Sequence, residues 1–120
     1  MSVLQLLRWQ WSGYPRYHHS RANLLIHIVV VPIFLAGNVG LVVSLFARSA
    51  VLGVVSVVAM LISVAMQGRG HRQEAVPAEP FTSPINAAAR IFLEQWITFP
   101  RFVVSGGWLR ALRQPTPPPL

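Results

Sequence analysis

The sequence predicts an all-α integral membrane protein built around a two-helix transmembrane hairpin, and three observations lead to this prediction. The 120 residues are 53% hydrophobic and only 11% charged, whereas an ordinary soluble domain has about 25% charged residues. Residues 22–47 and residues 49–68 form two long runs without a single charge. Nine of the ten arginines lie toward the chain ends, and Arg48 alone separates the two runs.

Each uncharged run is long enough to cross a bilayer, because about 20 helical residues span the hydrocarbon core. We therefore expect helices over residues 22–47 and 49–67, folded back on each other with both ends on one side. Since arginine is enriched on the cytoplasmic side, both chain termini are predicted to be cytoplasmic and Arg48 to lie outside. A bacterial plasma membrane and an endoplasmic reticulum membrane both fit. The alternative is a buried helical pair in a soluble protein.

Small residues mark the faces on which the two helices are expected to meet, because they let membrane helices approach closely. The stripes recur at spacings of three and four: Gly37, Gly40, Ser44 and Ala47 in the first helix, and Ser49, Gly53, Ser56, Met60, Ser63 and Gln67 in the second. Extended backwards, the first stripe reaches Asn23, which antiparallel packing places beside Gln67. The histidines around Asn23 should then lie close to His71.

The N-terminal segment is predicted to form a short amphipathic helix at the membrane interface over residues 3–11, with two tryptophans. Gly13 and Pro15 are expected to end it. Ser20 is the best N-cap for the first long helix, because its hydroxyl can accept a hydrogen bond from a free amide of the first turn. The two histidines before Ser20 would then precede that helix.

A second interfacial helix is predicted over residues 86–99, after a proline-rich irregular loop. Pro100 should kink or stop it, and the Gly-Gly pair that follows should break the chain again. A third membrane span over residues 86–104 is the alternative. We expect a single membrane domain over residues 1–114 and a disordered, proline-rich tail over residues 115–120.

The histidines supply a candidate metal site. The expected ligands are His19, His27, His71 and Glu74, with His18 and Asn23 as outer or substitute ligands. Nitrogen and oxygen donors without a thiolate suit Fe(II), Zn(II) or Mn(II), and two histidines with one carboxylate are the non-haem iron pattern. On one continuous helix His19 and His27 would be about 12 Å apart along the axis. A shared ion therefore requires the helix to begin at Ser20.

Several other kinds of chemistry are excluded by composition. The chain has no cysteine and no aspartate, which excludes thiolate zinc sites, Fe–S clusters, cysteine nucleophiles and Ser-His-Asp triads. The arginines are scattered singly and form no basic cluster, so we expect no nucleic-acid partner.

Two motifs carry a resemblance to a known family. The first is Tyr-His-His followed by Asn, His and Pro, and it is matched by Tyr17, His18, His19, Asn23, His27 and Pro32. The second is Gly-His followed by Glu and Pro-Ala, and it is matched by Gly70, His71, Glu74, Pro77 and Ala78. On these residues the chain resembles a divergent, short member of the membrane-embedded, iron-dependent 2-hydroxy fatty acid dioxygenases. That family acts in the conversion of phytosphingosine to odd-numbered fatty acids.

The chain departs from the family at two places. Family members are longer between the motifs, whereas a single pair of apolar runs joins them here. Ala75 and Val76 stand where basic residues are usual before Pro-Ala, and the spacing from His71 to Glu74 differs slightly. Glu79 is the substitute carboxylate.

The resemblance implies an Fe(II)-dependent oxidoreductase of lipid metabolism. A 2-hydroxy fatty acid would chelate the iron and be cleaved by O₂ beside C1, which shortens the chain by one carbon (fatty acid α-oxidation). The implied catalytic and iron-binding residues are His19, His27 and His71 with Glu74, surrounded by Tyr17, His18 and Asn23. The implied partners of the substrate carboxylate are Arg21, Arg69 and Arg72.

Two other functions stay open at this point: a non-catalytic small membrane protein that acts as a scaffold, and haem ligation by His27. The expected partners are the membrane, O₂ and a lipid or fatty-acid substrate. Formation of a homo-oligomer is left open.

Overall fold

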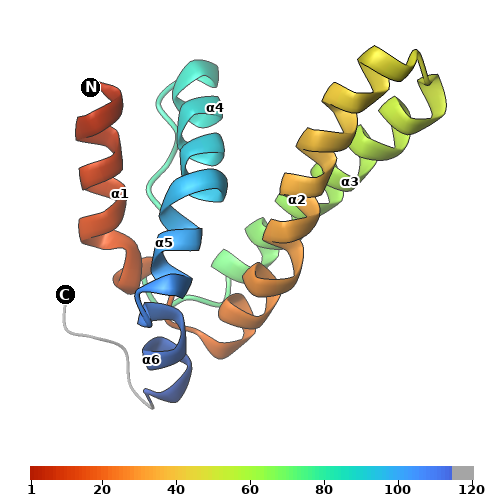
Figure 1. The fold of residues 1–120 in the computed structure, drawn as a ribbon. Coiled ribbons are helices and arrows are strands. Elements are labelled where there is room, and N and C mark those ends of the chain that lie inside the picture. The colour runs from red at the N-terminus through yellow and green to blue at the C-terminus, as the bar shows by residue number, and fades with distance from the viewer. Residues whose placement is uncertain (115–120) are drawn as a thin grey trace.

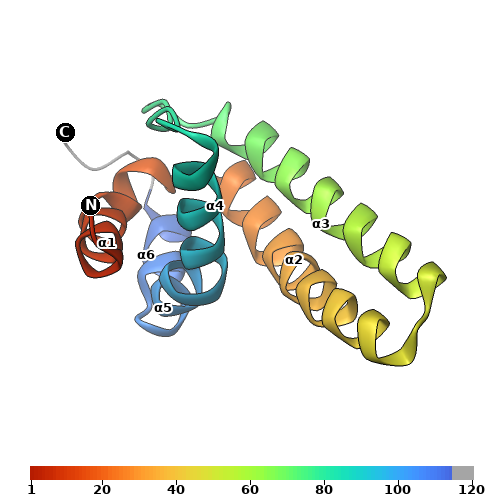
Figure 2. The ribbon, with the colours of Figure 1, turned by 90° about the horizontal axis from the view of Figure 1, so that it is seen from above.

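The computed structural model describes residues 1–114, and this part of the chain consists of helices and short connections, without a strand. Two long helices, α2 (Arg21–Ala47) and α3 (Ala50–His71), lie side by side and extend away from the rest of the molecule (Figures 1 and 2). The remaining helices gather around one end of this pair. The expected tail over residues 115–120 lies outside the described residues.

Helices α2 and α3 are long and apolar enough to cross a membrane. Only 28% and 17% of their most apolar stretches are buried in the chain, whereas the core helix of a soluble protein is mostly buried. Ser20 caps α2 by accepting a hydrogen bond from the Asn23 amide, which confirms the predicted start of this helix. Ser49 caps α3 in the same way, and Arg48 between the helices adopts a left-handed conformation with φ 51°.

The small-residue stripes lie between α2 and α3, as their spacing predicts. A Cβ added at Gly37 would lie 2.9 Å from the Ser56 carbonyl oxygen, and a Cβ at Gly40 would collide with the Ser56 hydroxyl. Closer to the other helices, the Ser63 hydroxyl donates a hydrogen bond to the Val30 carbonyl. These contacts bring the start of α2 beside the end of α3.

The N-terminal helix α1 (Val3–Tyr17) is longer than expected, because Gly13 and Pro15 do not end it. It begins with a capping box in which Ser2 and Gln5 satisfy each other's backbone amides. Pro15 sits in the last turn, where its missing N–H removes only one helical bond. Burial of Tyr14, which is 3% exposed, keeps this last turn helical.

The C-terminal segment also remains helical past Pro100, contrary to the predicted stop. Helix α4 (Pro84–Leu93) passes into a π-helical turn, η1 (Glu94–Thr98), and continues as α5 (Phe99–Val104). Proline is tolerated in a first helical turn, and Pro100 lies at the start of α5, directly after the π turn. The predicted break at the Gly-Gly pair is confirmed, since Gly106 has φ 85° and α6 (Gly107–Arg113) follows.

A compact core fixes these helices against the start of α2. It consists of Tyr14, Leu24, Val31, Phe99, Phe102 and Ala111. The Trp108 indole N–H donates to the Leu24 carbonyl at 2.9 Å, which ties α6 to α2. In contrast, the far ends of the long helices expose large apolar side chains, such as Phe46 (86%) and Val51 (76%).

Candidate metal centre

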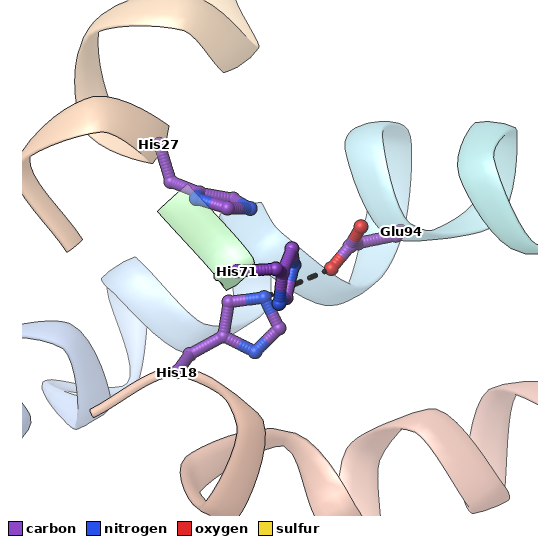
Figure 3. A group of neighbouring side chains, drawn as sticks. All are labelled: His18, His27, His71 and Glu94. Carbon is purple, nitrogen blue, oxygen red and sulfur yellow. Dashed lines mark ion pairs between the residues drawn. The ribbon is translucent and has the colours of Figure 1, made fainter. Parts of the chain in front are cut away.

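Four potential metal ligands from four separate segments meet where the long helices join the others. They are His18 at the end of α1, His27 in α2, His71 at the end of α3 and Glu94 at the start of η1 (Figure 3). One donor atom from each side chain lies within 4.8 Å of the corresponding atoms of the other three. The group could therefore hold one metal ion.

The three imidazole rings face one another nearly at right angles. Their centroids are 4.9 Å apart for His18 and His27, 4.7 Å for His18 and His71, and 5.0 Å for His27 and His71. Residues far apart in sequence are thus brought within the reach of a single ion. The predicted proximity of His71 to the histidines around Asn23 is confirmed.

Backbone carbonyls orient two of the rings. Nδ1 of His18 lies 3.1 Å from the Tyr14 carbonyl oxygen, and Nδ1 of His27 lies 3.0 Å from the Asn23 carbonyl oxygen. A carbonyl only accepts, so each Nδ1 donates to it and the Nε2 of each ring is left facing the other potential ligands. The same arrangement orients the histidine ligands of metal sites.

The inward nitrogens have few partners in the described chain. Nε2 of His27 and Nδ1 of His71 are buried without a hydrogen bond, and Nε2 of His18 lies 3.2 Å from the Glu94 carboxylate. Buried polar atoms are rarely left unpaired. A metal ion would satisfy all of these atoms at once.

The π turn points Glu94 toward the histidines. The Phe99 amide donates to the Glu94 carbonyl, five residues back, so both residues lie on one face of the helix. On a regular α-helix residues five apart would be rotated by about 140°. The Phe99 ring packs 5.8 Å from the His27 ring, which shows that this face meets the cluster.

The carboxylate is held in its charged form. Burial alone would raise the pKa of Glu94, but the contact with the His18 ring and the positive charge that the neighbouring imidazoles gain on protonation outweigh this effect. Together they lower the pKa of Glu94 to about 2. Glu94 is therefore available as an anionic ligand at neutral pH.

A pair of buried glutamines supports the π turn from α3. The Gln67 amide donates to Gln95 Oε1 at 2.9 Å, and the Gln95 amide donates to Gln67 Oε1 at 2.8 Å. Gln67 also donates to the Ser63 hydroxyl. This reciprocal pair fixes the position of the residue next to Glu94.

Aromatic rings close one side of the cluster. The Tyr14 ring stacks on the His18 ring with centroids 3.7 Å apart, and the Phe102 ring packs edge-on against Tyr14 at 4.9 Å. Burial raises the pKa of Tyr14 well above its ordinary value of 10, and the charge of Glu94 adds to this effect. Tyr14 is therefore a neutral phenol.

A cavity of about 780 Å³ opens beside the cluster, and His18, His71 and Glu94 form part of its wall. This volume lies in the range of about 300–1,000 Å³ that is typical of small-molecule sites. The cationic lining residues are Arg16, Arg72 and Arg90, and the apolar ones include Trp9, Val64, Phe81 and Ile91. Glu74, Glu79 and Glu94 line it as well, so the cavity combines charges of both signs with apolar surface and the potential metal ligands.

The structure gathers His27 and His71 as expected, but with His18 and Glu94 in place of His19 and Glu74. Glu74 is used elsewhere: its carboxylate accepts hydrogen bonds from the backbone amides of His19 and Ser20 at 3.0–3.1 Å. Glu74 therefore caps the start of α2, where the helix dipole favours a negative charge. His19 contributes its backbone to this cap and is not one of the four clustered residues.

The other expected residues are distributed around the centre. Asn23 donates to Glu74 at 2.7 Å and supports the cap. The Tyr17 hydroxyl lies on the cavity wall and donates to Glu79 at 3.3 Å. Neither Asn23 nor Tyr17 belongs to the group of four potential ligands.

Among the expected carboxylate-binding arginines, only Arg72 lines the cavity. Arg21 instead donates to the Leu112 carbonyl at 3.0 Å, which ties α2 to α6. Arg69 is exposed and is not part of the cavity wall. Arg16 and Arg90 line it, although neither was expected from the sequence.

Glu94 was missed as a ligand, although the sequence contains a signal for it. It is the only acidic residue in the predicted C-terminal helix and lies in a mostly apolar stretch, after Leu93 and shortly before Trp96, a position in which charge is costly without a partner. Ser20 as N-cap favours His19 as the residue that folds back over the helix start, so the sequence alone gives His18 only an outer place.

The fold and site together define a helical protein with two helices that could span a membrane and a partly buried group of three histidines and a glutamate that could hold a metal ion. Comparisons with protein-family models, with curated proteins and with solved structures find no match to this chain.

Proposed function

We propose that this chain is a membrane-embedded, Fe(II)-dependent dioxygenase of 2-hydroxy fatty acids. The observation that carries the proposal is the group formed by His18, His27, His71 and Glu94 at the wall of a cavity. The substrate class is drawn from the motif resemblance around Tyr17 and His71. The cavity supports it because its wall carries both arginines, which suit a carboxylate, and apolar side chains, which suit an acyl chain.

In this proposal α2 and α3 form a transmembrane hairpin with both chain termini in the cytoplasm, in a bacterial plasma or endoplasmic reticulum membrane. The exposed apolar side chains of the two helices support insertion, because such a surface is costly in water. Arginines at the open end and Arg48 alone at the tip support this orientation. The metal group then lies at the cytoplasmic end of the hairpin, with α1 and the α4–α5 segment at the interface.

The donor set fits Fe(II), because three imidazoles and one carboxylate without a thiolate suit divalent first-row metals. The buried nitrogens of His27 and His71, which lack partners in the described chain, support a bound ion. When bound, iron(II) would supply the electrons that activate O₂ and would act as a Lewis acid toward the oxygens of the substrate.

The proposed reaction converts a 2-hydroxy fatty acid and O₂ into the fatty acid one carbon shorter, CO₂ and water. The bond between C1 and C2 breaks, and four electrons pass from the substrate to O₂. Arg72 and Arg16 on the cavity wall would pair with the substrate carboxylate through charge-assisted hydrogen bonds. Val64 and Ile91 would contact the first carbons of the acyl chain.

Purified protein loaded anaerobically with Fe(II) and then exposed to O₂ and 2-hydroxypalmitate tests this proposal. Mass spectrometry should detect pentadecanoic acid, with the loss of C1 as CO₂ from carboxyl-labelled substrate. Glu94→Gln and His27→Ala should lose iron and product together. His19→Ala is the matched control, because it removes an imidazole that lies outside the group, and it should retain both.

Two negative results have different meanings. A wild-type protein that binds no divalent metal would refute the metal centre as a whole. Stoichiometric iron without any chain-shortened product would refute the reaction and the substrate class while leaving the metal centre in place.

A further inference from the structure

The Tyr14 hydroxyl is a buried polar group without a partner. Tyr14 is 3% exposed, and its hydroxyl oxygen makes no hydrogen bond of good geometry within residues 1–114, although the Glu94 carboxylate is close enough to raise its pKa. Most buried polar groups in folded proteins are hydrogen-bonded, because burial otherwise removes the bond to water without replacing it. The hydroxyl therefore requires an explanation beyond the packing of the ring.

Packing would be served equally well by phenylalanine. The Tyr14 ring stacks on His18 with an interplanar angle of 7° and packs against Phe102, and both contacts involve the aromatic ring alone. The stack places Tyr14 directly beside one of the four potential ligands. Only the hydroxyl distinguishes tyrosine from phenylalanine at this position.

The position of Tyr14 indicates which partner the hydroxyl would find. Tyr14 lines the same cavity as His18, His71 and Glu94, so it borders the space where a ligand of the ion would enter. A neutral phenol donates a strong hydrogen bond to an anionic acceptor. The fixed stack on His18 means that this donor is oriented before a ligand arrives.

We propose that the Tyr14 hydroxyl donates a hydrogen bond to an anionic ligand of the metal, such as a carboxylate oxygen or azide. The inference rests on the metal centre of the proposed function, but it holds whichever metal and substrate are correct. It assigns Tyr14 to ligand binding and leaves Tyr17, whose hydroxyl is paired with Glu79, outside that role.

Azide binding to the Co(II)-loaded protein tests the assignment. Cobalt reports its ligands through its visible spectrum, and azide is a small anion that can enter the cavity. Tyr14→Phe should bind Co(II) with unchanged affinity and spectrum but bind azide about tenfold more weakly, the loss expected for a charge-assisted hydrogen bond. Tyr17→Phe is the matched control and should bind azide like the wild type.

The outcomes are distinct. Equal azide affinity in the wild type and Tyr14→Phe would overturn the inference while the metal centre stands. A wild-type protein that binds no Co(II) would overturn the metal centre and this inference with it.

A measurement on the wild type keeps the inference testable if Tyr14→Phe does not fold. The infrared stretch of bound azide should shift between H₂O and D₂O, because an exchangeable proton would be bonded to it. A stretch that is insensitive to D₂O would overturn the inference.

Discussion

The reciprocal bond between Gln67 and Gln95 gives a prediction about stability that can be worked out from the contacts of each amide. The two side chains are 6% and 1% exposed and join α3 to the π turn that carries Glu94. In Gln95→Leu, Gln67 keeps its bond to Ser63 through Nε2, but its Oε1 loses its only donor. One orphaned buried acceptor costs about 1–3 kcal/mol.

The opposite substitution should cost more. In Gln67→Leu, both Oε1 and Nε2 of Gln95 lose their partner, so two buried atoms are orphaned and the expected loss is about 2–5 kcal/mol. The double variant Gln67→Leu/Gln95→Leu orphans no atom of the pair and replaces the amides with apolar groups of similar size. Such a replacement can be nearly neutral, so we expect the double variant to lie within about 1 kcal/mol of the wild type.

Unfolding in mixed detergent micelles, followed by circular dichroism and tryptophan fluorescence, measures all four proteins. The expected order of stability is wild type and double variant, then Gln95→Leu, then Gln67→Leu. A double variant that loses the sum of the two single losses would refute the reasoning, because additivity means that the glutamines do not act as a pair.

The remaining predictions concern the metal group and the contact between the long helices. His18→Ala should abolish stoichiometric metal binding while His19→Ala retains it, and elemental analysis of the purified proteins distinguishes the two. Because the pKa of Glu94 is lowered to about 2, its ionised form stabilises the metal-free fold fully above about pH 4.5, and this contribution is lost as the pH falls toward 2. The stability difference between the wild type and Glu94→Gln should therefore shrink over that window in acid unfolding curves, and a constant difference would contradict the assigned pKa. Gly40→Leu should destabilise the fold by about 1–3 kcal/mol through overpacking against Ser56, whereas unchanged detergent unfolding would show that the helices do not rely on this contact.

Local patterns in the sequence predict much of the helical framework. The two uncharged runs predict α2 and α3, and Ser20 predicts the start of α2, because span length and N-capping depend on neighbouring residues alone. Small residues at spacings of three and four predict which helix faces meet. From that packing it also follows that His27 and His71 lie together.

The sequence alone did not determine which histidine and which carboxylate complete the group. His18 rather than His19 enters the cluster, because its ring stacks on Tyr14 at the end of an α1 that continues past Pro15. Likewise, the Glu74 carboxylate accepts its hydrogen bonds at the N-terminus of α2, from residues 51–55 positions away in the chain. These outcomes depend on tertiary contacts, which cannot be predicted from the spacing of residues within one helix.

The sequence by itself therefore determined that this is a helical chain with two apolar helices whose polar, histidine-bearing ends adjoin. Only the tertiary structure decided that Glu94 faces the three histidines. A π turn inserts one extra residue into the helix, so the residues after it are rotated by about one residue's turn around the helix axis. Helical periodicity read from the sequence assumes that no such insertion occurs. The insertion is supported by the bond of Gln95 to Gln67 on another helix, and the packing that aims the carboxylate exists only in the folded chain.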